Sequence, residues 1–373
     1  MAGIYLHIPF CRSACHYCNF HFTTSLKGKE KLLPALCKEI ELRKNYLPDR
    51  HLKSIYFGGG TPSLLNIREI DLLLNQIFRY FTMEQDAEMT IEANPDDLTQ
   101  DYLKGLIELG INRLSIGIQS FFDDDLRWLG RTHSAEQAEK ALESALATGF
   151  SNLSIDLIYG IPGSSHFTKN LQKLKDFDIP HFSAYSLTLE PKTIYSWQVK
   201  KNRKLPPADD DMIRDFNLLC DFAEDNHYQH YEISNFSREG FRAIHNSAYW
   251  KNEPYLGIGP SAHSYNLISR QWNINVNHKY IMAISEGKDY FESETLSKTD
   301  RLNEYIMTRL RTSDGIDYQY LISLLTEEQK KEFDCQTTHF IRENFMSDKN
   351  GFLILTRKGM LLSDYIISKL FVE

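Results

Sequence analysis

Short apolar runs rich in branched side chains alternate with amphipathic stretches through the first half of the chain. Each amphipathic stretch is long enough to cross back over a sheet, so the pattern predicts parallel strands joined by helices. Buried parallel strands are apolar on both faces, and Leu114–Ile118 and Leu153–Ile158 have this character. The predicted strands are Ile4–Ile8, Ser54–Phe57, Glu88–Ala93, Arg113–Gly117, Leu153–Leu157 and Phe182–Leu187.

Six such units fit either an incomplete parallel (β/α)6 barrel, open on one side, or a doubly wound open sheet. Polar and glycine residues at the strand ends favour the barrel. They are a cysteine loop after the first strand, Gly58–Gly60 after the second, Glu92 at the third, Gln119 after the fourth and Asp156 within the fifth. In (β/α) barrels the C-terminal strand ends form the active-site face. We therefore predict an α/β partial barrel with one site at this rim.

Three cysteines stand directly after the first predicted strand, at Cys11, Cys15 and Cys18. Thiolates are soft ligands, and so short a loop can hold one face of a [4Fe–4S] cluster. Three protein ligands leave one iron open to a small molecule, as in catalytic metal sites. A zinc site of three cysteines and one histidine is the alternative, with His7, His16 and His21 nearby. A disulfide is disfavoured because the number of cysteines is odd and no signal peptide is expected.

Composition limits the compartment and the partners. The other cysteines lie singly on apolar helical stretches and are predicted to be packing residues: Cys37, Cys220 and Cys335. Scattered cysteines suit a reducing compartment and no apolar run reaches membrane-spanning length, so we expect a cytoplasmic protein without a transmembrane segment. The net charge of −8 argues against nonspecific nucleic-acid binding. The basic run Lys200–Lys204 precedes two prolines and is predicted to be a solvated loop.

The chain changes character near Leu296, and at 373 residues it exceeds the usual size of one hydrophobic core. The predicted order is helices at Arg301–Arg311, Tyr318–Leu325 and Gln336–Asn344, a turn at Asp348–Gly351 between short strands, and a final helix. This order suits a winged-helix-like, mainly helical domain over residues 296–373, after a barrel domain over residues 1–295. Similar numbers of basic and acidic side chains argue against DNA binding, so we expect this domain to cover the barrel opening or a ligand pocket.

The cysteine spacing, followed by Gly58–Pro62, resembles the radical S-adenosylmethionine superfamily. The resemblance covers most of the chain, through Glu92, Ser115–Phe121, Arg131 and Ile155–Pro162. Within the superfamily, the chain is most similar to the branch that contains oxygen-independent coproporphyrinogen III oxidase and a group of haem chaperones. The expected fold is the superfamily's partial barrel with the winged-helix-like C-terminal domain of this branch.

The resemblance implies two cofactors at the rim. A [4Fe–4S] cluster would be held by Cys11, Cys15 and Cys18, and S-adenosyl-L-methionine would bind its open iron, where an electron cleaves the C–S bond to a 5′-deoxyadenosyl radical. The methionine end would be held by Gly59, Gly60 and Thr61. Further contacts to the bound molecule are implied for Tyr5, Tyr17, Glu92, Gln119, Arg131 and Asp156. An acidic side chain suits ribose hydroxyls and an arginine suits a carboxylate.

Three departures favour the haem-chaperone group over the oxidase. Phe20 stands where the oxidase has a further cysteine, the chain starts almost directly with the first strand, and His245–Trp250 is similar to the chaperones' His-Asn-x-x-Tyr-Trp motif. Imidazole is a common axial ligand of haem iron, so His245 is the leading candidate. The residues alone also fit a structural role, with His245 satisfying loop backbone and Trp250 packing beneath the next turn. Other histidines could supply the ligand instead: His227, His230, His263 and His278.

The resemblance therefore implies a haem chaperone that carries haem as cargo to haem-requiring acceptor proteins. An oxygen-independent coproporphyrinogen III oxidase of porphyrin biosynthesis is the alternative. The sequence leaves open whether the chain is an enzyme, through S-adenosylmethionine cleavage or oxidase-like turnover. Other expected partners are an electron donor such as flavodoxin or ferredoxin and a second copy of the chain in a homodimer.

Overall fold

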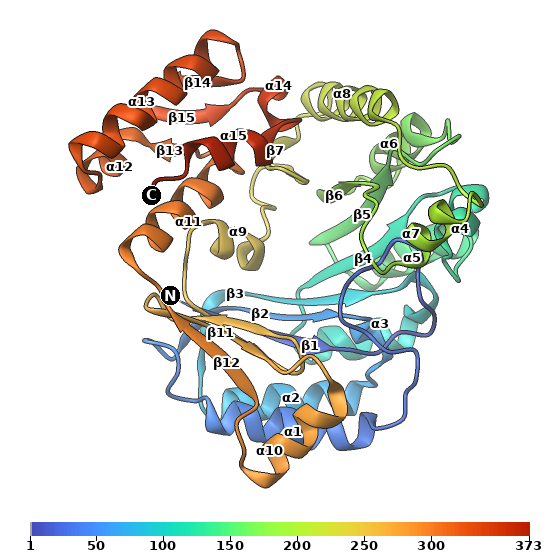
Figure 1. The fold of residues 1–373 in the computed structure, drawn as a ribbon. Helices are drawn as coiled ribbons and strands as arrows, with labels where there is room; N and C mark the ends of the chain where they lie inside the picture. Colours follow the sequence, from blue (N-terminus) through green and yellow to red (C-terminus); the bar gives the residue numbers. More distant parts are fainter. Residues whose placement is uncertain (1) are drawn as a thin grey trace.

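Parallel strands joined by helices make up the first half of the computed structural model, which describes residues 2–373 (Figure 1). The strands lie at the predicted positions, except that β3 begins at Thr82, well before the predicted Glu88. The elements are β1 (Ala2–Ile8), α1 (Lys29–Leu42), β2 (His51–Gly59), α2 (Ile67–Phe78), β3 (Thr82–Ala93), α3 (Gln100–Glu108), β4 (Arg113–Gln119), α4 (Asp123–Leu129), α5 (Ala135–Thr148), β5 (Leu153–Tyr159), α6 (Phe167–Asp176) and β6 (His181–Ser186).

Strands β1 to β6 lie side by side in chain order, and every adjacent pair is parallel. Right-handed crossovers in this order place the connecting helices on one face, and the sheet curls around the other. A doubly wound sheet would instead reverse its strand order at a switch point. Within residues 2–373, β1 pairs with β2 and β9 and not with β6, so the barrel is incomplete, as predicted.

The chain after β6 extends both edges of this sheet. Antiparallel β8 and β7 continue from β6, whereas β9 pairs in parallel with β1 and leads to β10, β11 and β12. In the sequence, helix α9 comes after β8 and before β9, the strands that extend the two edges. It packs against β1 and β2. The elements are α7 (Ile194–Lys200), α8 (Asp209–Asp225), β7 (Gln229–Glu232), β8 (Asn235–Ser237), α9 (Ile244–Trp250), β9 (Tyr255–Ile258), β10 (His263–Tyr265), β11 (Ser269–Asn273), α10 (Asn277–Glu286) and β12 (Phe291–Thr295).

The C-terminal region is mainly helical with a three-stranded antiparallel sheet, in line with the winged-helix-like prediction. Its elements are α11 (Lys298–Leu310), β13 (Ile316–Asp317), α12 (Tyr318–Leu324), α13 (Glu327–Arg342), β14 (Met346–Lys349), β15 (Phe352–Leu355), α14 (Arg357–Met360) and α15 (Ser363–Leu370). Helix α13 starts before the predicted Gln336 because Thr326 and Gln329 form a capping box. A separate apolar core includes Ile306, Leu321 and Phe340. None of the helices in residues 2–373 is long and apolar enough to cross a membrane.

The start of the C-terminal region runs from one edge of the large sheet to the other. Leu296 N–H donates to Ile268 O beside β11, and Ile233 N–H beside β7 donates to Arg311 O, both at 3.0 Å. Arg270 of β11 also pairs with Glu304 of α11 at 2.6 Å. The C-terminal region therefore lies across the open side of the barrel (Figure 1). The boundary at residue 296 stays a prediction.

Candidate functional site

The C-terminal ends of the barrel strands open into a cavity of about 460 Å³. Most of the predicted site residues line it: Cys11, Cys15, Tyr17, Cys18, Gly59, Gly60, Thr61, Glu92, Gln119, Arg131 and Asp156. They come from the cysteine loop and from β2 to β5 or the segments that follow these strands. Residues distant in the sequence meet here because the parallel strands all end at this rim.

Backbone hydrogen bonds hold the cysteine loop, residues 10–24, at its ends and its middle. Cys11 N–H donates to Thr23 O at 3.0 Å, and Thr23 N–H donates to Pro9 O at 2.8 Å. His16 N–H donates to Leu129 O, at the end of α4, at 2.9 Å. The loop is thus tied to the end of β1 and to the helix that follows β4.

Two hydrogen-bond donors face the sulfur atoms of this loop. Thr61 Oγ1 lies 3.4 Å from Cys11 Sγ, and Arg131 Nη1 lies 3.4 Å from Cys15 Sγ. Burial raises the pKa of Cys11 and raises that of Cys18 to about 11. These thiols are therefore protonated at neutral pH until a metal centre takes the place of their protons. Soft sulfur ligands with hydrogen-bond donors beside them fit an iron–sulfur cluster.

The neighbouring histidines are engaged with protein partners. His7 Nε2 lies 2.9 Å from His21 O, and His21 Nε2 lies 2.7 Å from Asn277 Oδ1. His16 Nδ1 lies 2.9 Å from Trp128 O. In the part of the chain that the structure describes, no three His, Cys, Asp or Glu side chains gather as ligands of one ion.

The glycine segment after β2 passes directly beside the cysteine loop. Gly59 has a φ of +113°, which favours glycine, and a Cβ there would lie 2.7 Å from the His7 ring. A Cβ on Gly60 would lie 2.7 Å from Phe10 O and 2.9 Å from Ile8 O. Only bare backbone fits here, because the atoms in the way of a Gly60 side chain belong to the main chain.

Two half-buried carboxyl groups, those of Glu92 and Asp156, line the cavity. Glu92 accepts hydrogen bonds from the Tyr56 hydroxyl at 2.8 Å and from Gly59 N–H at 3.1 Å. Burial is the largest effect on both carboxyl groups, and it raises the pKa of Glu92 to about 7 and that of Asp156 to about 6. Both groups can therefore accept hydrogen bonds from a cationic or hydroxyl-bearing ligand, and binding of a cation would favour their ionised forms.

Arg131 lines the same cavity, and one N–H group of its guanidinium has no hydrogen-bond partner. Its Nη2 donates to Asn94 Oδ1 and to Gly117 O, both at 2.7 Å, but its Nε is buried without a partner. Gln119, at the end of β4, has a φ of +69°, which is uncommon for a residue other than glycine. An unpaired buried donor beside strained backbone suits a cavity that takes up a ligand with an acceptor group.

The His-Asn-x-x-Tyr-Trp segment forms α9 and lies at the other end of the strands, away from the cysteine loop. His245 Nδ1 is 2.8 Å from Ser54 Oγ, in the first half of β2, and His245 Nε2 is 2.9 Å from the Tyr249 hydroxyl. The ring is buried, and burial lowers its pKa to about 3. Both ring nitrogens have partners here, so the imidazole offers no free nitrogen to a haem iron in this arrangement.

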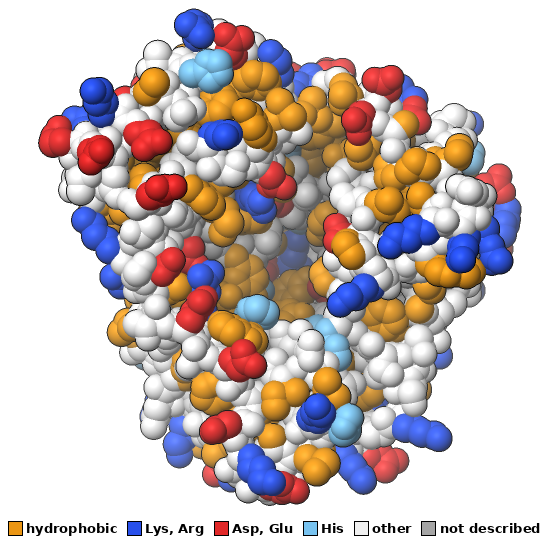
Figure 2. Space-filling view, viewed as in Figure 1, with side chains coloured by type: hydrophobic (Ala, Val, Ile, Leu, Met, Phe, Trp, Pro, Cys, Tyr) orange, Lys and Arg blue, Asp and Glu red, His pale blue; other side chains and the backbone are white. Residues whose placement is uncertain are grey.

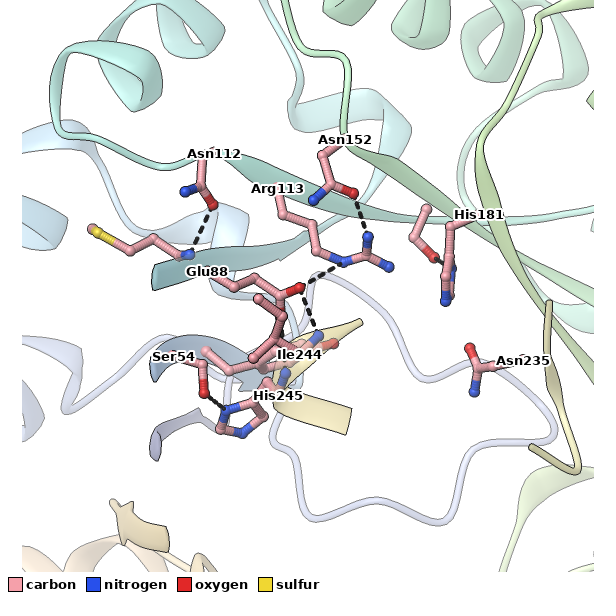
Figure 3. A network of polar contacts seen from close by, with 12 residues as sticks. Ser54, Glu88, Asn112, Arg113, Asn152, His181, Asn235, Ile244 and His245 are labelled. Carbon is pink, nitrogen blue, oxygen red and sulfur yellow. Dashed lines mark hydrogen bonds and ion pairs between the residues drawn. The ribbon is translucent and has the colours of Figure 1, made fainter. Parts of the chain in front are cut away.

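A buried ion pair holds the start of α9 (Figure 3). The Glu88 carboxylate accepts hydrogen bonds from the backbone N–H groups of Ile244 and His245, at 2.9 and 3.0 Å. Its Oε2 also lies 3.9 Å from Arg113 Nε, and both side chains are buried. Arg113 donates in turn to Asn152. Glu88 therefore sits between the helix and a buried cation and sets the position of α9 against the barrel.

Tyr56 connects this helix to the cavity. Its hydroxyl donates to Glu92, and its ring stacks on the His245 ring with centroids 5.0 Å apart. Tyr5 stacks on the same two rings at 6.0 and 6.3 Å, and its hydroxyl lies 3.1 Å from His7 Nδ1. Tyr5 does not line the cavity; it lies beneath it, between the rim and α9.

Sequence reasoning missed the Glu88–Arg113 pair. The available signal was a charged residue inside or at the start of a predicted buried strand, where an isolated charge is costly. The prediction for the single cysteines was right for Cys37 and Cys220, which pack on the main core. It was wrong for Cys335, which is exposed on α13.

Family models match two parts of the chain. The model of the Radical SAM superfamily matches residues 5–174, and that of the HemN C-terminal domain matches residues 296–362. A Bacillus subtilis protein named heme chaperone HemW is 32% identical over 98% of this chain and 98% of its own length. A Lactococcus lactis protein of the same name is 32% identical over 99% of this chain and 97% of its own length.

A solved structure has the same fold. It is coproporphyrinogen III oxidase, HemN, from Escherichia coli, with a TM-score of 0.86 and 24% identity over 100% of this chain and 90% of that chain.

Proposed function

Since this chain belongs to the radical S-adenosylmethionine superfamily and, within it, to the family of proteins named heme chaperone HemW, we propose that it carries haem to haem-requiring proteins. We further propose that it holds a [4Fe–4S] cluster and S-adenosyl-L-methionine at the rim cavity. The observation that carries this proposal is the meeting of three thiols, a bare glycine segment and an unpaired arginine donor in one cavity.

The donor set fits the two groups. Cys11, Cys15 and Cys18 would hold the cluster, and the cluster would supply the electron for cleavage of the sulfonium C–S bond. Gly59, Gly60 and Thr61 would hold the methionine end of S-adenosylmethionine. Tyr17, Glu92, Gln119, Arg131 and Asp156 would complete its surroundings, with Tyr5 supporting the floor from below.

The chain's own groups would respond to the bound cation. Glu92 and Asp156 bind protons readily because burial raises the pKa of each. A positive sulfonium or ammonium group favours their ionised forms, so binding would release protons. The free Nε of Arg131 would donate to a carboxylate, which is the strong, charge-assisted kind of hydrogen bond.

Haem carriage is proposed from family membership and involves α9. If His245 is the iron ligand, its ring must first leave Ser54 or Tyr249, so haem binding would move the side chain or the helix. The test is a haem titration followed by visible absorption in the wild type, His245→Ala and Ser54→Ala. Ligation by His245 predicts a shifted band in the wild type and in Ser54→Ala, and a weaker or displaced band in His245→Ala. An unchanged spectrum in His245→Ala would assign the ligand to another residue, whereas no shifted band in any variant would contradict haem carriage.

The alternative activity is oxidative decarboxylation of coproporphyrinogen III, and the fold shared with HemN is what favours it. Anaerobic incubation of reconstituted protein with coproporphyrinogen III, S-adenosylmethionine and a reductant decides between the two. The chaperone proposal predicts no decarboxylated product, and turnover would establish the oxidase. We also propose a homodimer, which analytical sedimentation would test, and a division into residues 1–295 and 296–373, which limited proteolysis would test. The proposed location is the cytoplasm, which cell fractionation would test.

A further inference from the structure

Helix α7 and Lys204, at the end of the basic run Lys200–Lys204, contact the cysteine loop. Tyr195 N–H, in α7, donates to His16 O at 2.7 Å, and Lys204 Nζ lies 3.0 Å from His16 Nδ1. His16 is the residue between Cys15 and Tyr17. The run is mostly exposed, as the sequence predicts, but its last residue, Lys204, is half-buried against the cysteine loop.

The segment around α7 forms what we call the basic face: Lys192, Lys200, Lys201, Arg203 and Lys204. The first four side chains are exposed and Lys204 is half-buried. None of the five takes part in an ion pair with an acidic residue of the described chain, residues 2–373. Figure 2 shows Lys and Arg side chains gathered where Figure 1 places α4 and α7. This concentration of positive charge stands out on a chain whose net charge is −8.

Apolar side chains are interspersed with these cations. Trp197 is 47% exposed and Leu205 is 71% exposed. The Arg203 guanidinium lies over the Trp197 ring at 4.7 Å from its centroid. Phe20, on the cysteine loop itself, is 70% exposed, and its neighbour Asn19 donates to Glu190 at 3.0 Å. Exposed aromatic and arginine side chains together are typical of protein interfaces.

We propose that the basic face is the docking surface for an acidic one-electron carrier protein. The inference rests on the proposed function, because only a redox centre in the loop needs an electron from outside. In the transfer the carrier is oxidised by one electron, which the metal centre of the loop accepts, and no bond or proton is exchanged. A carrier docked here would lie against the loop that holds the cysteines. Because electron transfer slows steeply with distance, this short path to the metal centre favours the basic face. Opposite charge on the partner would steer the encounter and orient it.

The surface favours a protein over other polyanions. A nucleic acid is bound through many phosphate contacts along an extended basic stripe, whereas this face is confined to one segment beside one loop. Its exposed Trp197 and Leu205 offer apolar contact that a phosphate backbone does not use. Transient complexes between redox proteins also have small interfaces, and a compact face such as this one can provide one.

The test compares two variants with the same change in charge. Lys200→Glu/Lys201→Glu alters the basic face, and Lys330→Glu/Lys331→Glu alters α13 in the C-terminal region, far from α7 in Figure 1. The readout is binding of an oxidised, acidic flavodoxin to reconstituted protein, measured by calorimetry at low and high salt. We expect the basic-face variant to bind at least about tenfold more weakly at low salt, with the difference vanishing at high salt, and the α13 variant to bind as the wild type does.

Reduction kinetics give a second, independent readout. Dithionite needs no docking surface, so it should bleach the cluster absorption of both variants at the wild-type rate. Reduced flavodoxin should bleach the basic-face variant more slowly. The proposal would be overturned if wild type and basic-face variant bind flavodoxin equally, or if both variants lose binding equally. Binding of a short RNA and of anionic vesicles is measured in the same way. The proposal would also be overturned if the basic-face variant loses binding only to one of these two. A wild type that holds no cluster but still binds flavodoxin through this face would contradict the proposed function instead.

Discussion

Replacing Glu88 by alanine removes the acceptor that fixes α9 to the barrel. The Arg113 cation would then be buried without its carboxylate, 3.9 Å away in the native protein, and two helix N–H groups would lose their partner. Breaking a buried ion pair on one side costs about 3–5 kcal/mol, so we expect a loss of about 4 kcal/mol. At about 1.4 kcal/mol per factor of ten, local opening of α9 becomes roughly a thousandfold more frequent.

Amide hydrogen exchange read by mass spectrometry over residues 244–250 measures this opening. Asp86→Ala is the matched control, because it removes the same charge from an exposed position of the same strand and should change stability by less than about 0.5 kcal/mol. Adding Arg113→Met to Glu88→Ala should restore part of the loss, since the unpaired cation is gone. Protection of α9 that stays within about tenfold of wild type in Glu88→Ala would refute the reasoning.

Three further predictions concern the rim and the remaining cysteines. Gly60→Ala should lower the iron bound per chain after reconstitution, because its Cβ would lie 2.7 Å from Phe10 O; iron content equal to wild type would contradict this. Burial raises the pKa of Glu92 from 4.5 to about 7, so the stability this group contributes below pH 4.5 is lost as the pH rises through 7. Glu92→Gln should therefore match the wild type near pH 4 and exceed it at pH 8, by up to about 3 kcal/mol in denaturant titrations of protein without cofactors. Cys37→Ala and Cys220→Ala should leave reconstituted iron content unchanged, and a loss of iron in either would show that packing is not its role.

The barrel could be predicted because its signal is local and repeated. Each apolar run is a parallel strand in the structure, and the polar groups at strand ends marked the rim where they meet. The cysteine loop and the glycine segment were recognisable because each depends on residue types at fixed spacing. The sequence also predicted that the C-terminal domain covers the barrel opening. It could not show the hydrogen bonds that place this domain, such as Ile233 N–H to Arg311 O, because contacts between distant segments leave no periodic trace in the sequence.

The surroundings of α9 could not be predicted for a similar reason. The sequence left open whether His245 is a haem ligand or a structural residue. It could not show that Ser54 and Tyr249 occupy the ring nitrogens, because Ser54 lies far from His245 along the chain. The basic run at Lys200–Lys204 was predicted to be a solvated loop and is mostly exposed, but nothing in its own composition indicates the contact of Lys204 with His16. In both cases the fold brings together residues whose pairing has no local signature.

Iron and sulfide analysis of anaerobically reconstituted protein tests the central claim most directly, when wild type is compared with the Cys11→Ser/Cys15→Ser/Cys18→Ser variant. We expect about four iron and four sulfide per wild-type chain. We also expect an electron paramagnetic resonance signal after reduction that changes when S-adenosylmethionine is added, and neither iron nor signal in the triple variant. Equal iron in both proteins, or zinc as the only metal in the wild type, would contradict the proposed cluster.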